Sequence, residues 1–150
     1  MSQTTTIQTT TSQNTTSPAA ITAGRRSLPP ITISGIDFDR LAKLAELGTD
    51  RAPAAAEFLA REVARAKVVP SGFPLTGVVV MGSEVEFRDD VTGQVRTVTL
   101  VYPEQADISI RRISVLTPIG AALIGLSAGQ SIEWQTPAGG WRSLTVLRVG

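Results

Sequence analysis

The reactive side chains in this sequence limit the chemistry that the chain can perform. Among its 150 residues there is no histidine and no cysteine. A serine–histidine triad, a histidine–metal site, a thiolate metal site and a disulfide are therefore excluded. The lack of cysteine favours a reducing cytoplasm. The candidates that remain are pairs of carboxylates, one glycine-rich stretch and one pair of arginines.

Two pairs of carboxylates could act on a cation or a proton. Asp89 and Asp90 could hold a hard cation, but adjacent acids shortly before Gly93 are typical of a hairpin turn. Glu84 and Glu86 alternate along an expected strand and could act as acid and base, whereas a solvated strand face is the ordinary explanation. We expect no catalytic residue, no metal site and no cofactor, so the chain is predicted not to be an enzyme.

The glycine-rich stretch and the arginine pair each have a functional and a structural explanation. Residues 120–127, "GAALIGLS", have the glycine spacing of a phosphate loop, but Leu126 stands where that loop needs a lysine. A helix with its cap explains the stretch better. Arg111 and Arg112 could contact a phosphate or an acidic partner, or could be a solvated pair.

Bulk composition excludes several classes of partner. Lysine and arginine count 14 against 13 acids, a formal charge of +1 that gives no global attraction to nucleic acid or an anionic membrane. No apolar run reaches the roughly 18 residues of a membrane span. We expect a cytoplasmic monomer without membrane contact. Residues 1–28, rich in Thr, Gln and Ser, are predicted to be a disordered tail.

Residues 29–69 are predicted to form a short antiparallel helical hairpin, a small coiled coil. Apolar residues recur at helical spacing after Asp37, and Gly48 ends that run. Pro53 suits the first turn of a second, alanine-rich helix. Residues 70–76, which contain two prolines and a glycine, are predicted to be a linker.

Residues 77–150 are predicted to form a small antiparallel β domain curled around one short helix. Alternating runs such as "SEVEFRD" and "QVRTVTLVYP" are typical of half-buried strands. Between two such runs lies "SVLTPIGAALIG", in which Thr117 can cap a helix, Pro118 fits its first turn and Gly125 can end it. Leu116 and Ile119 have no obvious need to be buried, and we expect them to form an apolar corner that docks a protein partner.

Several of these stretches resemble a known family. "VVVMGSEVEFRD", "TGQVRTVTLVYP", "ISVLTPIGAALIGLSAGQSIEW" and "TPAGGWRSLTVLRV" are similar to the FKBP-like C-terminal domain of the GreA/GreB transcript-cleavage factors, and more closely to the Rnk regulators of nucleoside diphosphate kinase. The likeness spans most of residues 77–149. It implies an α+β fold, in which a helical hairpin precedes an FKBP-like β domain with one short helix.

The resemblance also implies a partner and a set of contact residues. Members of this family grip RNA polymerase at the rim of its secondary channel, with the hairpin directed into the channel, so any association with nucleic acid would be indirect, through the elongation complex. Carried over to this sequence, the contact set is Asp107, Ser114, Leu116, Thr117, Pro118 and Ile119.

The hairpin tip distinguishes the branches of the family. Cleavage factors carry acidic tip residues that help to hold a catalytic metal, whereas here Asp50 stands alone beside Arg51 on a short arm. The chain is therefore expected to compete with the cleavage factors without stimulating cleavage, as an Rnk-type regulator. The alternatives are an FKBP-like prolyl isomerase and direct regulation of nucleoside diphosphate kinase by binding.

Overall fold

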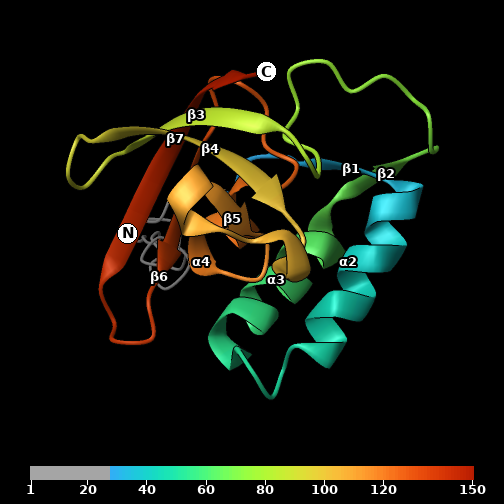
Figure 1. Ribbon diagram of the computed structural model, residues 1–150, viewed down its shortest axis with the longest axis horizontal. Helices are drawn as coiled ribbons and strands as arrows, with labels where there is room; N and C mark the ends of the chain where they lie inside the picture. The colour runs from blue at the N-terminus through green and yellow to red at the C-terminus, as the bar shows by residue number, and fades with distance from the viewer. Residues whose placement is uncertain (1–27) are drawn as a thin grey trace, which may run out of the picture.

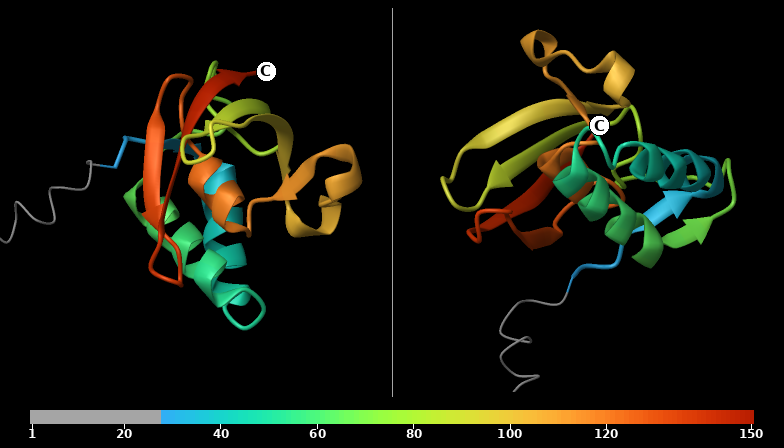
Figure 2. Two further views of the ribbon diagram at one scale, coloured as in Figure 1. Left: turned by 90° about the vertical axis from the view of Figure 1, so that its left-hand side faces the viewer. Right: turned by 90° about the horizontal axis from the view of Figure 1, so that it is seen from below.

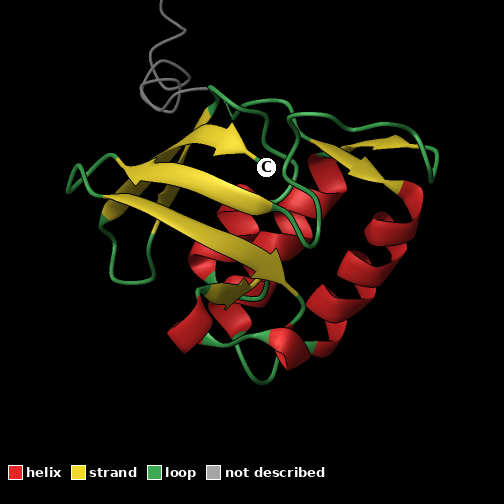
Figure 3. Ribbon diagram, turned by 45° about the horizontal axis from the view of Figure 1, so that its top comes forward, coloured by secondary structure: helices red, strands yellow, loops and turns green. Residues whose placement is uncertain are grey.

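The computed structural model describes residues 28–150 (Figure 1). The tail expected at residues 1–28 lies outside the described residues, apart from Leu28. A pair of helices lies beside a curled five-stranded sheet, and a short helix lies between the two (Figure 3). This arrangement matches the predicted α+β class.

The helical pair forms where local sequence signals place it. Helix α2 (Gly35–Leu47) begins after Ser34, whose side-chain hydroxyl accepts a hydrogen bond from the Asp37 amide at 3.4 Å, and it ends at Gly48. Helix α3 (Pro53–Arg65) starts with proline, which has no amide hydrogen that would be left unpaired there. The two helices are joined by five residues and run antiparallel, as predicted.

A small two-stranded sheet closes the open end of the hairpin. Strands β1 (Thr32–Ser34) and β2 (Lys67–Val69) pair in parallel, because the hairpin between them returns the chain to its starting side. Each strand has only three residues, too few to show an alternating pattern, so the sequence did not predict them. This pairing fixes the base of the hairpin against the rest of the molecule.

The large sheet has the strand order β5-β4-β3-β7-β6. Its strands are β3 (Glu84–Asp89), β4 (Val95–Val101), β5 (Arg112–Ser114), β6 (Ser131–Gln135) and β7 (Trp141–Val149). All neighbouring pairs are antiparallel except β4 and β5, which are parallel. The prediction of a wholly antiparallel sheet is therefore wrong at β5.

The connection from β4 to β5 explains that parallel pair. The chain leaves β4, makes two 3₁₀ turns, η2 (Pro103–Gln105) and η3 (Ile108–Ile110), and re-enters the sheet in the same direction. Residues 76–82, although rich in valine, form no strand: in that segment only Val78 forms a bridge, to Ser127. Short irregular connections of this kind leave no periodic signal in a sequence.

One buried apolar cluster joins the hairpin to the sheet. It includes Leu41 and Leu59 from the helices, Phe87 and Leu100 from the strands, and Leu123 from helix α4 (Pro118–Leu123). The rings of Phe58 on α3 and Trp134 on β6 have centroids 5.8 Å apart. Both helices of the hairpin are thus packed against the β domain, and the loop that joins them lies at the end of the molecule (Figure 2).

A second, polar contact ties helix α2 to the sheet. The Tyr102 hydroxyl, just after β4, donates to the Asp37 carboxylate at 3.4 Å. Burial, followed by the nearby negative charge of Asp37, raises the pKa of Tyr102 above its ordinary value. Tyr102 therefore stays protonated and remains a donor at neutral pH. No helix among residues 28–150 is long and apolar enough to cross a membrane.

Candidate functional site

The turn before α4 is held by three short-range hydrogen bonds. The Gly120 amide donates to the Thr117 side-chain oxygen at 3.0 Å, which is the helix cap expected from the sequence. The Thr117 hydroxyl in turn donates to the Ser114 carbonyl at 2.7 Å, and the Leu116 amide donates to the Ser114 hydroxyl at 2.9 Å. Residues 114–117 are therefore locked in one conformation by their own side chains.

Gly120 allows this turn to close tightly. A Cβ atom added to Gly120 would lie 2.1 Å from the Ser114 carbonyl oxygen and 2.7 Å from the Val115 Cα. Both neighbours are backbone atoms, which cannot move aside as a side-chain end can. The first turn of α4 thus packs directly on the chain that leads into it, and only glycine fits there.

The exposure of this corner differs in part from the prediction. Pro118 is exposed, but Leu116 and Ile119 are each half-buried and pack against the core. The Leu116 side chain lies against the end of α2, where a Cβ added to Gly48 would come within 2.8 Å of its Cδ2 atom. The end of α2 thus packs on the Leu116 side chain, and this contact connects the corner to the hairpin.

The corner forms one wall of a groove of about 490 Å³, here called the arginine groove. Four of the predicted contact residues line it: Ser114, Thr117, Pro118 and Ile119. Leu116 and Asp107 are not part of the lining. The other lining residues lie in or directly after η2, η3 and the strands β4 to β7, namely Arg96, Ala106, Ile108, Arg112, Ile113, Trp134, Thr136 and Arg142. Most of the lining surface is apolar, and its charged residues are three arginines.

Sequence reasoning missed most of this lining. Ile108 is 80% exposed, and Trp134, at 9%, shows only a small part of its surface. Arg96 and Arg142 lie on different strands, far apart in the sequence. Of the three arginines in the lining, only Arg112 stood out in the sequence, because it forms a pair with Arg111. The strand order brings the other residues together, so no linear motif marks them.

Asp107 has a structural role beside this groove. Its carboxylate accepts hydrogen bonds from the Ser109 hydroxyl at 2.6 Å and the Ser109 amide at 3.0 Å. These bonds lower the pKa of Asp107 below its ordinary value. Its backbone also exchanges two hydrogen bonds, of 2.9 and 3.0 Å, with Arg112. Asp107 thereby fixes the η3 turn that presents Ile108.

The hairpin tip, which joins α2 to α3, is a compact turn close to the corner that precedes α4. The amides of Arg51 and Ala52 donate to the Gly48 carbonyl at 3.2 and 2.9 Å. Asp50 and Arg51 are both exposed. Since Gly48 rests on Leu116, the tip lies beside the corner that precedes α4.

The acidic pair at residues 89 and 90 is engaged by protein donors. Asp89 accepts from the amides of Val91 and Thr92 and pairs with Arg142. Burial raises the pKa of Asp90, but hydrogen bonds from Arg88, Thr145 and Ser143 outweigh it and leave that pKa below its ordinary value. Within residues 28–150, no three acidic side chains come together as a metal site would require. The pair therefore builds the turn and holds Arg142.

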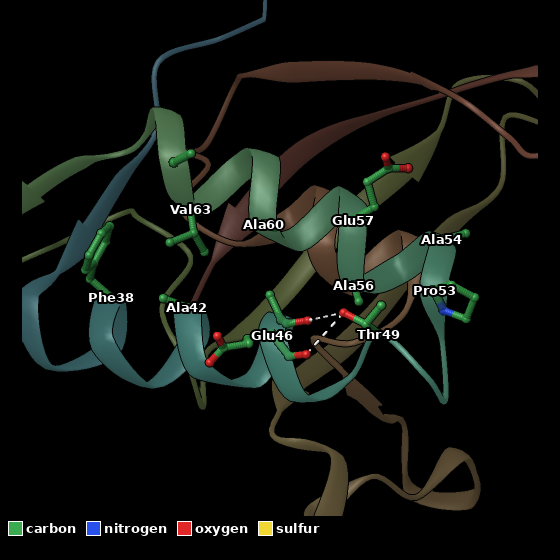
Figure 4. Close-up of a pocket in the computed structure, with 12 residues that line it drawn as sticks. Phe38, Ala42, Glu46, Thr49, Pro53, Ala54, Ala56, Glu57, Ala60 and Val63 are labelled. Atoms are coloured by element: carbon green, nitrogen blue, oxygen red, sulfur yellow. Dashed lines mark hydrogen bonds between the residues drawn. The ribbon is translucent and has the colours of Figure 1, made fainter.

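A second and larger groove, of about 900 Å³, runs along the outer side of the helical pair (Figure 4). We call it the alanine groove, because six of its lining residues are Ala42, Ala45, Ala54, Ala56, Ala60 and Ala64. Its charged lining residues are Glu46 and Glu57, one from each helix, and Glu57 already pairs with Arg61 at 3.6 Å. The Thr49 hydroxyl at its end bonds to the carbonyls of Ala45 and Glu46.

Comparisons with known proteins identify relatives of both parts of the chain. Residues 29–69 match the family profile described as the Rnk N-terminus, and residues 74–150 match that of the C-terminal region of transcription elongation factor GreA/GreB. The regulator of nucleoside diphosphate kinase of Escherichia coli K12 is 40% identical over 124 residues, which cover 82% of this chain and 90% of that protein.

Two further relatives extend the likeness to the elongation factors. GreA of Syntrophobacter fumaroxidans is 36% identical over 91 residues, 61% of this chain and 58% of that protein. The solved structure of a GreA/GreB elongation factor from Nitrosomonas europaea superimposes with a TM-score of 0.61 at 39% identity, covering 79% of this chain and 98% of that one.

Proposed function

This chain belongs to the Rnk-type branch of the GreA/GreB family, and from that premise we propose that it is a non-enzymatic regulator of RNA polymerase. It docks at the rim of the secondary channel through the corner at residues 114–119. There it competes with the cleavage factors and does not stimulate transcript cleavage itself. It acts in the cytoplasm, where the polymerase works.

The position of the hairpin tip is the observation that best supports this proposal. Each helix of the pair has 13 residues, and so is only about 20 Å long. The base of the tip is tied to the corner at residues 114–119, because Gly48, where α2 ends, packs on Leu116. A molecule seated by this corner would keep its tip near the contact surface, well short of a distant active centre.

The charges at the tip favour the same function. A hard cation is held by carboxylate oxygens, and residues 47–53 contain one carboxylate, that of Asp50. The adjacent Arg51 places a positive charge beside it, which opposes cation binding. Such a tip can occupy space in a channel but is poorly suited to deliver a metal.

The preorganised corner favours docking over catalysis. Its three internal hydrogen bonds and the close approach at Gly120 hold it in shape, so little conformational entropy is lost on binding. A prolyl isomerase needs several aromatic side chains around its substrate, whereas Trp134 is the single aromatic residue among those lining the arginine groove. An effect on nucleoside diphosphate kinase would follow indirectly, through transcription.

The first test measures binding to core RNA polymerase. Leu116→Asp and Ile119→Asp place a charge at the corner and should each weaken capture at least about tenfold, since a buried unpaired charge is costly. Ala60→Asp, in the exposed floor of the alanine groove, is the matched control and should bind like the parent. Circular dichroism of each variant separates lost docking from lost folding.

The outcomes of this test separate the function from the contact residues. If the parent does not bind polymerase, the proposed function is wrong. If all three variants bind equally well while folded, the corner is not the contact.

A second experiment, on a stalled elongation complex, tests the regulatory role. The chain should block GreA-stimulated cleavage and should cause no cleavage when it is added alone. Cleavage stimulated by the chain itself would contradict the non-enzymatic role.

A further inference from the structure

A further groove, of about 570 Å³, is lined mainly by residues of α3, of β6 and of the turn after β6. We call it the acidic groove, because its charged lining residues are three glutamates, Glu57, Glu62 and Glu133, and one arginine, Arg61. Glu62 pairs with Arg65 at 2.7 Å, and Glu57 pairs with Arg61 at 3.6 Å. Glu133 has no ion pair within residues 28–150. The groove therefore presents more negative than positive charge.

The described part of the chain begins at this groove and is fixed there. Leu28, which is 48% exposed, is one of the lining residues. The carbonyl of Pro29 accepts a hydrogen bond of 2.5 Å from the Arg65 guanidinium. The buried Glu62 carboxylate holds the same guanidinium with two further bonds of 3.0 and 2.7 Å. This clamp determines that the residues before Leu28 enter the fold at the acidic groove.

The residues before Leu28 carry the opposite charge. Residues 1–27, which lie outside the described part of the chain, contain two charged side chains, and both are basic: Arg25 and Arg26. At no more than about 3.6 Å per residue, the Cα atom of Arg25 lies within about 11 Å of that of Leu28. Because Leu28 itself lines the groove, both guanidinium groups are tethered close to the glutamates. Arginine and carboxylate form strong, paired hydrogen bonds.

This tether favours the chain's own segment over other occupants of the groove. A group held a few residues away has an effective concentration on the order of millimolar, which a separate molecule seldom reaches. The negative lining also repels the phosphates of nucleic acid and of anionic lipids. A basic segment of the same chain fits both the charge and the position of the groove.

We infer that residues 19–27 occupy the acidic groove, with Arg25 and Arg26 paired to Glu57 and Glu133. Glu57 can take a new partner, because its pair with Arg61 is an exposed one, with the two side chains 74% and 61% accessible, and such pairs are weak. The mostly apolar residues 19–24, "AAITAG", cover the apolar part of the lining.

The same segment regulates docking, and this part of the inference rests on the proposed function. Pro118, an exposed residue of the docking corner, lines both the acidic groove and the arginine groove. A segment seated in the acidic groove therefore obstructs one side of the corner. A partner must displace it in order to bind, so the occupied groove lowers the affinity of the full chain.

Tryptophan fluorescence reports directly on this groove. Both tryptophans of the chain, Trp134 and Trp141, line it, and Trp141 is 37% exposed. In the full chain, Arg25→Glu/Arg26→Glu, here called the tail variant, should raise the acrylamide quenching constant above that of the parent, because the repelled segment uncovers Trp141. Equal quenching of the parent and the folded tail variant would overturn the inference.

Matched variants identify the contact. Lys43→Glu/Arg148→Glu changes the net charge equally at exposed positions outside the groove, and should leave quenching as in the parent. Glu133→Arg, added to the tail variant, should restore part of the protection, and no restoration in the folded chain would overturn the pairing with Glu133. Protection that grows with protein concentration would place the segment in a second copy, and would overturn its assignment to the same chain.

Binding to core polymerase tests the regulation separately. The tail variant should bind roughly threefold more tightly than the parent, the effect of losing one or two exposed ion pairs that hold the segment in place. Equal binding, together with a difference in quenching, would overturn the regulation and leave the occupied groove standing. A parent that does not bind polymerase would instead contradict the proposed function, while the fluorescence result would still decide whether the segment occupies the groove.

Discussion

The arginine groove and the alanine groove differ in how their walls are built and in the charge that they carry. The arginine groove is the smaller, at about 490 Å³ against about 900 Å³. Its wall at residues 114–120 is fixed by backbone contact and a helix cap, and its charged lining residues are all basic. The alanine groove is walled by two helices with small side chains, and its charged residues, Glu46 and Glu57, are acidic.

Under the proposed function the smaller groove belongs to the docking surface, so volume would be a poor guide to it. A large groove lined by small side chains offers few anchors and little directional bonding. The smaller groove combines a rigid apolar corner with two guanidinium groups, those of Arg96 and Arg112, that have no ion pair within residues 28–150. Groups of this kind can make directional contacts. Disturbing its wall should therefore cost both stability and binding, whereas the matched changes elsewhere should cost little.

The largest effect is expected from Gly120→Ala. The new Cβ would lie 2.1 Å from the Ser114 carbonyl oxygen, so the backbone must shift. We expect a loss of at least about 2 kcal/mol in unfolding free energy, and a fall in Tm of roughly 8 °C. Thermal unfolding measures both. In the control, Gly140→Ala, the new Cβ meets only Thr136 Oγ1 at 3.6 Å, so stability should be almost unchanged. Equal losses in the two variants would contradict the tight approach at Gly120.

An intermediate effect is expected from Thr117→Ala. This change removes the cap of α4 and the bond to the Ser114 carbonyl, and should cost about 1–2 kcal/mol. Thr49→Ala, at the end of the alanine groove, removes an exposed hydroxyl and should lower the unfolding free energy by only about 0.3 kcal/mol. Denaturant unfolding of both variants gives the two free energies. A larger loss for Thr49→Ala would reverse the comparison.

The smallest effect is a difference in acid sensitivity between the two grooves. The pKa values of Asp90 and Asp107, near the arginine groove, are both lowered in the folded state. Their stabilisation is therefore complete above the unfolded pKa, and is lost as the pH falls from about 5 through and below 3.8. Amide exchange should rise in the loops at 89–94 and 107–111 before it rises in α2 and α3.

A variant identifies the cause of this acid sensitivity. Asp90→Asn removes one of the two aspartates whose pKa is lowered on folding, so the loss of stability between pH 5 and pH 3 should be shallower than in the parent. Simultaneous exchange of loops and helices, together with an unchanged slope in Asp90→Asn, would show that these carboxylates do not control the acid response.

The elements that could be predicted are those with signals carried by neighbouring residues. The cap at Thr117 and the prolines at 53 and 118 mark where α3 and α4 begin, and Gly48 marks where α2 ends. Helix α4 itself ends at Leu123, two residues before the predicted Gly125. The parallel pairing of β5 and the three-residue strands β1 and β2 were missed, because pairing partners are chosen by contacts distant in the sequence.

The same distinction applies to the candidate site. The run from Ser114 to Ile119 was identified in advance, since its cap and its family resemblance are both local. Trp134, Ile108 and the arginines from β4 and β7 were not, because strand order alone brings them to one groove.

By itself, the sequence determined where α3 and α4 begin and where α2 ends, the absence of histidine and cysteine chemistry, and the capped turn at residues 114–118. Only the tertiary structure decided that the hairpin lies against the sheet, that its tip rests on Leu116 and that basic side chains from separate strands surround one apolar groove. Caps and turns are stabilised by neighbours along the chain, whereas a groove and its charge arise from elements that meet only when the core is buried.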